Sequence, residues 1–349
     1  MKRLLLFSLP GFIVAASIAP SRADDEPKAS DVKTYLLQTT ARMQAAATDF
    51  EKNAVEYQRI IDAANGDYAK ALQTSREKIL SLVRAMQENY KAMDSFGYET
   101  IEGIVAGVKP LQDFDVYLDA GVPKSQESPG ATIAPVVLQT KTGRVIDHEG
   151  CLFTYIIEPA LWGGNPHFVI RADVNGDGKI EPKESLPLAD VMLAAAVDVH
   201  KKINELAAAS GVWKPTTEDY FAAIIMMTPT LSGYFDDWKE TRYAPQASGK
   251  FSAVSRVSDM RGIMGSVAVL YNAVQPNVET KDPALARAIK RGFSDILAFI
   301  DRVDAREKKG KISVPQIDEL GSQAKEKADK LVPQIEQAAA ILAVKVQGA

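Results

Sequence analysis

Apolar residues spaced three and four positions apart, the period of an α-helix, run through most of this chain. The clearest stripe starts at Asp282-Pro283, a capping residue followed by Pro at the first helical position, and continues through Leu285, Ile289 and Phe293. Ser313 with Gln316 three residues later forms a capping box that predicts another helix. The pattern therefore predicts an all-α protein of antiparallel helical bundles.

Other segments carry the same period. We expect long helices over 30–62 and 66–94, joined by a turn at Asn65-Gly66, and a helix from Leu188 to a stop at Gly211. Two more helical regions are expected over 216–243, divided near Pro229, and over 247–278.

The middle of the chain lacks this period. Residues 119–150 are rich in Gly, Pro and Ser, and predict an irregular insert with two short strands at 136–138 and 144–146. We divide a single domain, residues 24–349, into a first helical half over 30–118, the insert over 119–150, a loop over 173–184 and a second helical half over 186–345.

The first 23 residues read as a signal peptide. Lys2 and Arg3 precede an apolar stretch from Leu4 to Ile18, and small residues end at Ala23, where we expect cleavage. The stretch is short for a membrane anchor, and the only cysteine, Cys151, lies far from it. These features predict a protein free in the periplasm or the medium, with no membrane anchor.

Charge narrows the choice of partners. The chain carries 41 basic and 45 acidic residues, for a net charge of −4, and cleavage after Ala23 would remove three basic residues and bring it to −7. An acidic balance argues against nucleic acid as a partner and is compatible with cation binding. Because Cys151 is alone, no internal disulfide can form, and we expect it to be a small buried apolar residue.

The most specific local motif is a twelve-residue sequence that fits the EF-hand calcium loop, from Asp173 to Glu184. Its ligands would be the side chains or, for Lys179, the backbone carbonyl of Asp173, Asn175, Asp177, Lys179, Glu181 and Glu184. Gly178 stands at the position of the sharp turn, and Ile180 at the usual apolar position.

The surroundings of this loop differ from those of a paired EF-hand. Ser185 follows the loop where an apolar residue normally begins the exiting helix, and residues 164–168 form a poor entering helix. We therefore expect the loop to be followed by a helix, with no entering helix and no paired hand. Such a loop would bind Ca²⁺ at roughly 10⁻⁴–10⁻³ M and act as a structural staple. The alternative is an acidic turn that binds no metal.

Three further segments resemble the imelysin-like family, especially the EfeO-type periplasmic proteins of bacterial iron uptake. They are Tyr98-Glu99-Thr-Ile101-Glu102, the acidic Asp115 with Leu118-Asp119, and Ile157-Glu158-Pro-Ala-Leu161-Trp162-Gly163, with a looser likeness from Asp259 to Phe293. The resemblance implies an all-helical, two-bundle fold and a role in periplasmic metal binding, beside a membrane permease or a peroxidase of an uptake system.

The family motif places a histidine three residues before the glutamate of its metal pair. Here that position is Tyr155, and only Glu158 matches. A second set of hard oxygen ligands, Glu102, Asp119, Tyr155 and Glu158, would hold Fe³⁺ or another transition metal. The alternative is that Tyr155 and Glu158 share a buried hydrogen bond that ties helices together.

These features lead to a non-catalytic metal-handling protein stapled by calcium. The alternative is a binding module for a polysaccharide or a partner protein, with the insert as its contact surface and calcium ordering it. A metallopeptidase ranks last, because no His-Glu-x-x-His motif accompanies the family's older label.

Overall fold

The computed structural model describes residues 32–245 and 251–345, so the expected signal segment, residues 1–23, lies outside the described residues. Helices account for 72% of the structure and strands for 5%, which confirms the predominantly helical class predicted from the sequence. Among the described helices, none is both long and apolar enough to cross a membrane.

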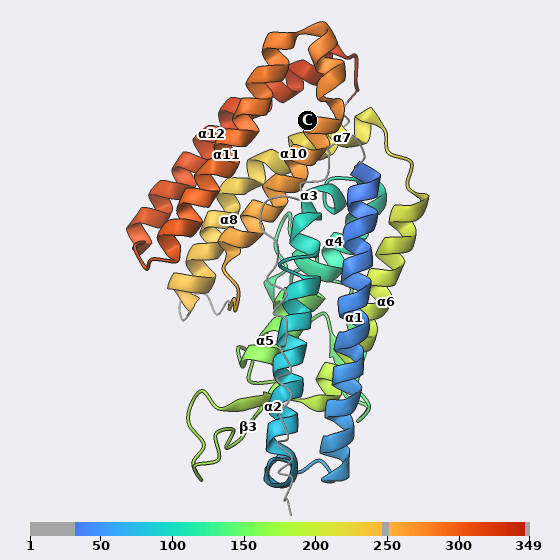
Figure 1. The fold of residues 1–349 in the computed structure, drawn as a ribbon, viewed down its shortest axis with the longest axis vertical. Coiled ribbons are helices and arrows are strands. Elements are labelled where there is room, and N and C mark those ends of the chain that lie inside the picture. The colour runs from blue at the N-terminus through green and yellow to red at the C-terminus, as the bar shows by residue number, and fades with distance from the viewer. Residues whose placement is uncertain (1–31, 246–250, 346–349) are drawn as a thin grey trace, which may run out of the picture.

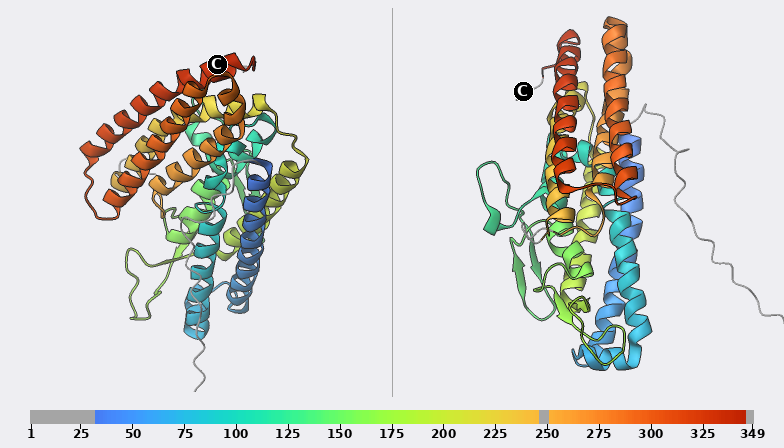
Figure 2. Two further views of the ribbon diagram at one scale, coloured as in Figure 1. Left: turned by 45° about the horizontal axis from the view of Figure 1, so that its top comes forward. Right: turned by 90° about the vertical axis from the view of Figure 1, so that its left-hand side faces the viewer.

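One group of long helices contains the N-terminal half of the chain. Its members are α1 (Val32–Ala63), α2 (Tyr68–Met93) and α6 (Ala189–Val212) (Figure 1). α1 packs against both α2 and α6, and α1 and α2 lie side by side (Figure 2). The predicted turn between α1 and α2 is confirmed: Asn65 and Gly66 have φ angles of 57° and 78°, and Asp67 then caps α2 by accepting a hydrogen bond from Lys70 N at 3.0 Å.

A second group contains the C-terminal half. Its elements are α7 (Thr217–Met227), η6 (Thr228–Thr230), α8 (Leu231–Trp238), η7 (Lys239–Tyr243), α10 (Arg256–Lys281), α11 (Pro283–Glu307) and α12 (Val314–Ile341). Pro229 lies in η6, where the expected helix over 216–243 divides. Of the helix expected over 247–278, residues 247–250 lie outside the described residues, 251–255 are not helical, and α10 begins at Arg256 with Ser255 as its N-cap. The capping box of Ser313 and Gln316 is present at the start of α12.

Short helical segments connect the two groups. They are η1 (Tyr98–Thr100), α3 (Glu102–Val105), η2 (Lys109–Leu111), α4 (Gln112–Asp115), η3 (Val116–Ala120), η4 (Lys124–Gln126), η5 (Leu152–Ile157) and α5 (Glu158–Trp162). Gly103 and Gly107 allow α3 to pack directly on the second group, because an added Cβ would lie 2.5 Å from Ser266 Oγ and 2.3 Å from Ala223 Cβ, respectively. The acidic segments that precede the insert are thereby held between the two helix groups.

Two small antiparallel sheets complete the fold. β1 (Val137–Gln139) pairs with β2 (Val145–Asp147), one residue later than predicted, and Leu138 opposite Ile146 is the buried pair. β3 (Val169–Arg171) pairs with β4 (Ser185–Pro187), so Arg171 lies opposite Ser185 and the strands enclose the acidic loop. The insert is therefore partly ordered by its own hairpin, which packs on α6.

The acidic loop does not lead directly into a helix as expected. It leads into β4, and α6 begins only at Ala189. Leu186 precedes Pro187, and a residue before proline is sterically biased toward extended conformations. The sequence Ser185-Leu186-Pro187 consequently continues as a strand rather than as the first turn of a helix.

Candidate metal centre

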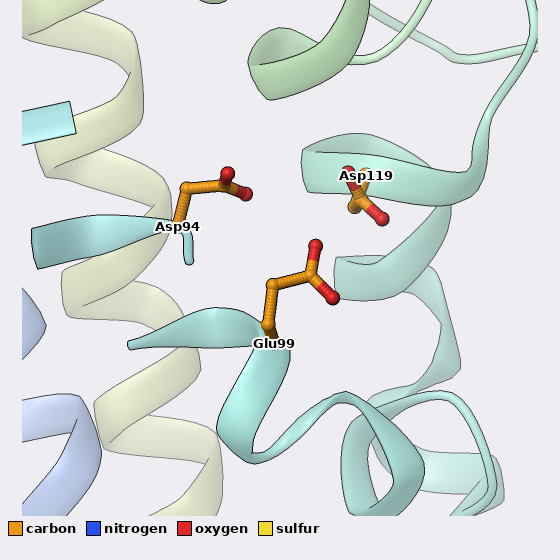
Figure 3. A group of neighbouring side chains, drawn as sticks. All are labelled: Asp94, Glu99 and Asp119. Carbon is orange, nitrogen blue, oxygen red and sulfur yellow. The ribbon is translucent and has the colours of Figure 1, made fainter. Parts of the chain in front are cut away.

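Three carboxyl groups from separate elements converge between the two helix groups. Asp94 is the C-cap of α2, Glu99 lies in η1 and Asp119 lies in η3. One oxygen of each lies within 4.8 Å of the other two. Figure 3 shows the three side chains pointing toward one another. Oxygens at this spacing can bind one cation together, since Ca²⁺ to oxygen distances in proteins reach about 2.6 Å.

The chain between Asp94 and Glu99 is folded tightly enough to bring these two residues together. The Asp94 backbone carbonyl accepts hydrogen bonds from Gly97 N and Glu99 N, each at 3.1 Å. Gly97 is required in this turn, because a Cβ there would lie 2.4 Å from the carbonyl oxygen of Met93. The tight turn in this short segment therefore places two buried acids, Asp94 and Glu99, close together in space.

Asp119 is held from the other side by the chain that follows the insert. The Thr154 hydroxyl donates to Asp119 Oδ1 at 2.9 Å, and the Cys151 thiol donates to the Asp119 carbonyl at 2.6 Å. Both donors flank or lie in η5, a π-helical segment, and Asp119 itself lies in the π-helical η3. Such segments are rare and occur often at functional sites.

The carboxyl groups are buried without full compensation. Asp94 and Glu99 are 2% and 1% exposed. Four carboxylate oxygens here accept no hydrogen bond from an amide, hydroxyl or guanidinium of the described residues: Asp94 Oδ1, Glu99 Oε2, Glu102 Oε2 and Glu158 Oε2. Each unsatisfied buried oxygen costs about 1–3 kcal/mol of stability. Several such oxygens in one place therefore indicate a function other than stabilising the fold.

Burial raises the pKa of each of these acids more than any other effect. It carries the pKa of Asp94 and of Glu99 well above the ordinary range, and the charges of Asp119 and Asp259 raise both further. Burial also raises the pKa of Asp119, while the Arg256 charge and the Thr154 hydroxyl lower it. Without a cation, the cluster therefore retains protons at pH values where exposed carboxyl groups have lost theirs. A bound cation would take the place of those protons.

One buried guanidinium provides the positive charge of this region. Arg256 Nη1 donates to Asp259 Oδ2 at 3.0 Å, while Nε lies 3.4 Å from Asp237 Oδ2 and Nη2 lies 3.7 Å from Glu158 Oε2. Burial lowers the pKa of Arg256, but the surrounding carboxylates outweigh burial and raise it above the usual value. Arg256 therefore stays charged and partly neutralises the acids around it.

Glu99, Asp119 and Arg256 line a cavity of about 170 Å³. At roughly 30 Å³ for each water molecule, the cavity has room for a cation with part of its hydration shell. Its walls consist mainly of acidic groups, tyrosines and the guanidinium: Glu99, Asp119, Ala120, Thr154, Tyr155, Tyr234, Asp237, Arg256 and Asp259.

The second ligand set expected from the sequence is divided by the structure. Asp119 belongs to the converging group, whereas Glu102 is not part of it and its Oε1 accepts from the Tyr234 hydroxyl at 2.6 Å. Tyr155 lines the cavity, but its hydroxyl donates to Gln126 Oε1 at 3.0 Å. Glu158 Oε1 accepts from the backbone amides of Ala253 at 2.7 Å and Val254 at 3.5 Å, and so anchors the chain before α10.

Sequence reasoning did not find Asp94, Asp259 or Arg256 as site residues, and it included Glu99 only in a motif. One signal was available for Asp94. It follows the buried Tyr90 by four residues at the end of an amphipathic helix, which places an acid on the apolar face of α2. Arg256 and Asp259 carry a similar signal, three residues apart at the start of α10.

The acidic loop between β3 and β4 is folded around its own ligand positions. Asp173 Oδ1 accepts from Gly176 N at 2.7 Å, Asn175 Oδ1 from Asp177 N at 2.8 Å and Asp177 Oδ1 from Lys179 N at 2.9 Å. Glu184 closes the loop by accepting from Asn175 N at 3.0 Å and from Glu181 N at 2.9 Å.

Two arginines fix this loop to the rest of the protein. Arg76 of α2 donates to the carbonyls of Asp173 and Val174 at 2.5 and 2.6 Å, and Arg171 of β3 donates to the carbonyls of Glu181 and Pro182. The loop is therefore held in place by arginine hydrogen bonds to its backbone carbonyls. Its acidic side chains remain exposed or half-exposed.

No family model matches this sequence, and no curated protein is significantly similar to it. The role of the buried carboxyl groups therefore has to be inferred from their geometry and chemistry.

Proposed function

We propose that this protein is an exported, non-catalytic cation-binding protein that handles a metal such as iron, and that its cation binds at Asp94, Glu99 and Asp119. The observation that carries the proposal is the convergence of these three carboxyl groups, two of them almost fully buried, with Glu99 and Asp119 lining a cavity that holds further acids. Hard cations prefer carboxylate oxygens, and a cation would satisfy the oxygens that lack donors.

The arrangement favours binding over hydrolysis. The three groups are held between helices, and no histidine is among the residues that line the cavity. An all-oxygen set of this kind suits iron, manganese, calcium or magnesium. The likeness to imelysin-like proteins supports iron, and with it a role in uptake beside a permease or a peroxidase.

Titration calorimetry on chelator-stripped protein tests the buried site. The measurement is made in an Asp173→Ala variant, which lacks a proposed ligand of the acidic loop, so that the loop does not bind the added metal. In this variant we expect one site for Mn²⁺ or ferric nitrilotriacetate. Glu99→Gln with Asp119→Asn should weaken it at least about 100-fold, because two of three charged ligands are lost. The control Asp113→Asn removes an exposed acid near the site and should leave the affinity unchanged. Unchanged binding in the double variant would refute the proposed ligands.

We further propose that Ca²⁺ binds the loop from Asp173 to Glu184 and acts as a staple. The side chains at ligand positions already turn inward through bonds to the loop's own amides. A cation would pull these carboxylates onto itself and tie β3 to β4, since the two strands end at the loop.

Calcium should therefore raise the melting temperature. With a dissociation constant of roughly 10⁻⁴–10⁻³ M, 10 mM Ca²⁺ would add about 1.4–2.7 kcal/mol to the free energy of unfolding. Asp173→Ala should abolish this gain, whereas Asp49→Ala, which removes an exposed acid of α1, should retain it. Equal calcium stabilisation of all three proteins, measured by scanning calorimetry, would show that the loop is an acidic turn.

A further inference from the structure

Tyr90 is a buried tyrosine whose hydroxyl makes no hydrogen bond to the described residues. The residue is fully buried, and its hydroxyl has no hydrogen-bond partner among the described residues. A buried tyrosine hydroxyl usually finds a partner, because desolvation without a hydrogen bond is unfavourable. Phenylalanine would fill the same space without this cost, so the hydroxyl requires a separate explanation.

Tyr90 lies beside the acidic cluster. Tyr90 lies four residues before Asp94 on α2 and therefore on the same helix face. Its ring packs edge-on against Phe153 and Trp162, with centroids 6.0 and 5.5 Å away, which restricts its rotation. The backbone N–H of Asp94 donates to the Tyr90 carbonyl at 2.8 Å, and Phe153 is followed by Thr154, whose hydroxyl donates to Asp119. Burial raises the pKa of Tyr90 most, and the charges of Asp94 and Glu158 raise it further.

The atoms without partners thus form one set. Tyr90 Oη, Asp94 Oδ1 and Glu99 Oε2 are all buried, and none has a hydrogen-bond partner among the described residues. Glu158 Oε2 is likewise without a hydrogen bond, although it lies 3.7 Å from Arg256 Nη2. The other nearby tyrosines are already engaged: Tyr98 donates to Asp115 Oδ1 at 2.7 Å and Tyr234 donates to Glu102 Oε1 at 2.6 Å. Only Tyr90 among these three has a hydroxyl left for a ligand.

We propose that Tyr90 is a further ligand of the buried site and that it selects a hard trivalent cation, for which Fe³⁺ is the probe. This inference rests on the proposed cation site at Asp94, Glu99 and Asp119. On binding, a bond forms between Fe³⁺ and Tyr90 Oη as the phenolic O–H bond breaks, and the proton passes to the buffer. The iron is neither oxidised nor reduced. Phenolate and carboxylate oxygens are hard ligands, and a trivalent ion gains most from a set of anionic oxygens.

Visible absorption spectroscopy tests the assignment, because a phenolate bound to Fe³⁺ gives a charge-transfer band that carboxylates alone do not give. Ferric nitrilotriacetate added to the wild-type protein should produce this band. Tyr90→Phe should lose it and bind Fe³⁺ about tenfold more weakly, while its affinity for Mn²⁺ changes little. The matched control Tyr98→Phe, which removes a hydroxyl already bonded to Asp115, should retain the band.

The outcomes separate the two proposals. Saturable Fe³⁺ binding by the wild type without the band, or a band that persists in Tyr90→Phe, overturns the role of Tyr90 and leaves the carboxylate site intact. An absence of any saturable binding overturns both. The melting temperature of metal-free Tyr90→Phe should equal or exceed that of the wild type, since the substitution removes an unpartnered hydroxyl, and this confirms that the variant is folded.

Discussion

The metal-free protein is expected to be more stable at pH 5.5 than at pH 8. Burial is the main cause of the raised pKa values of Glu158 and Asp115, which reach about 7 in each case. A carboxyl group whose pKa is raised on folding holds its proton more tightly in the folded state than in the unfolded state. The free energy of unfolding therefore falls as the pH rises from the unfolded pKa, near 4, through 7.

The size of this effect follows from the same values. For Glu158, a pKa of about 7 against an ordinary value of about 4.3 corresponds to roughly 4 kcal/mol of lost stability once the group is fully ionised. Asp115 acts in the same direction, and so do Asp94 and Glu99. Urea unfolding at pH 5.5, 6.5 and 8 in the presence of a chelator measures the change.

Two comparisons identify the cluster as the source of this dependence. The variant Asp94→Asn with Glu99→Gln should flatten the pH profile and should be more stable than the wild type at pH 8, because neutral amides replace buried acids. Excess cation should reverse the trend in the wild type, since cation binding favours ionised ligands. A wild-type protein that becomes more stable from pH 5.5 to 8 without metal would contradict the assignment.

Most of the helical fold could be predicted because local signals agree with tertiary packing. The helix starting at Pro283 has Asp282 as its cap and buries the whole stripe of Leu285, Ile289 and Phe293. The turn at Asn65-Gly66 was equally clear, since few residues other than glycine and asparagine adopt a positive φ readily. In these segments each residue pattern has one plausible conformation.

The candidate site could be predicted only in part, because it depends on contacts between distant segments. Asp94, Asp119 and Asp259 come from three regions that the sequence separates by 25 and 140 residues. Short motifs indicated the region around Glu99 and Asp119, but motif spacing along a helix cannot say which acids meet across a helix junction. The close packing that brings them together depends on Gly103 and Gly107, whose significance appears only in three dimensions.

Tyr155 and Glu158 illustrate the same limit at the level of single side chains. The resemblance to the imelysin-like motif suggested them as ligands, with Tyr155 at the position of the family's histidine on the same helical face as Glu158. Tyr155 lies within the π-helical η5, however, and its hydroxyl donates to Gln126 in the insert. Glu158 accepts hydrogen bonds from the backbone amides of Ala253 and Val254, and no sequence pattern predicts this contact.

Arg256→Met should destabilise the protein by about 3–5 kcal/mol at pH 8, which is the usual cost of removing one partner from a buried ion pair. The guanidinium is paired with Asp259, Asp237 and Glu158, and methionine would fill its volume without compensating their charge. At pH 5.5 the loss should be smaller, because the pKa of Asp259, raised by burial to about 6, allows that acid to take up a proton instead.

Arg261 on the same helix provides a matched control. It is paired with Asp301 at 2.9 Å, but the two side chains are 39% and 60% exposed, so Arg261→Met should cost at most about 1 kcal/mol at either pH. Adding Asp259→Asn to Arg256→Met should recover part of the lost stability, since it removes one uncompensated charge. If Arg256→Met costs no more than Arg261→Met in urea unfolding at pH 8, Arg256 does not serve as the counter-charge of the buried acids. Those acids would then be protonated throughout the neutral range, and a cation would have to displace several protons to bind.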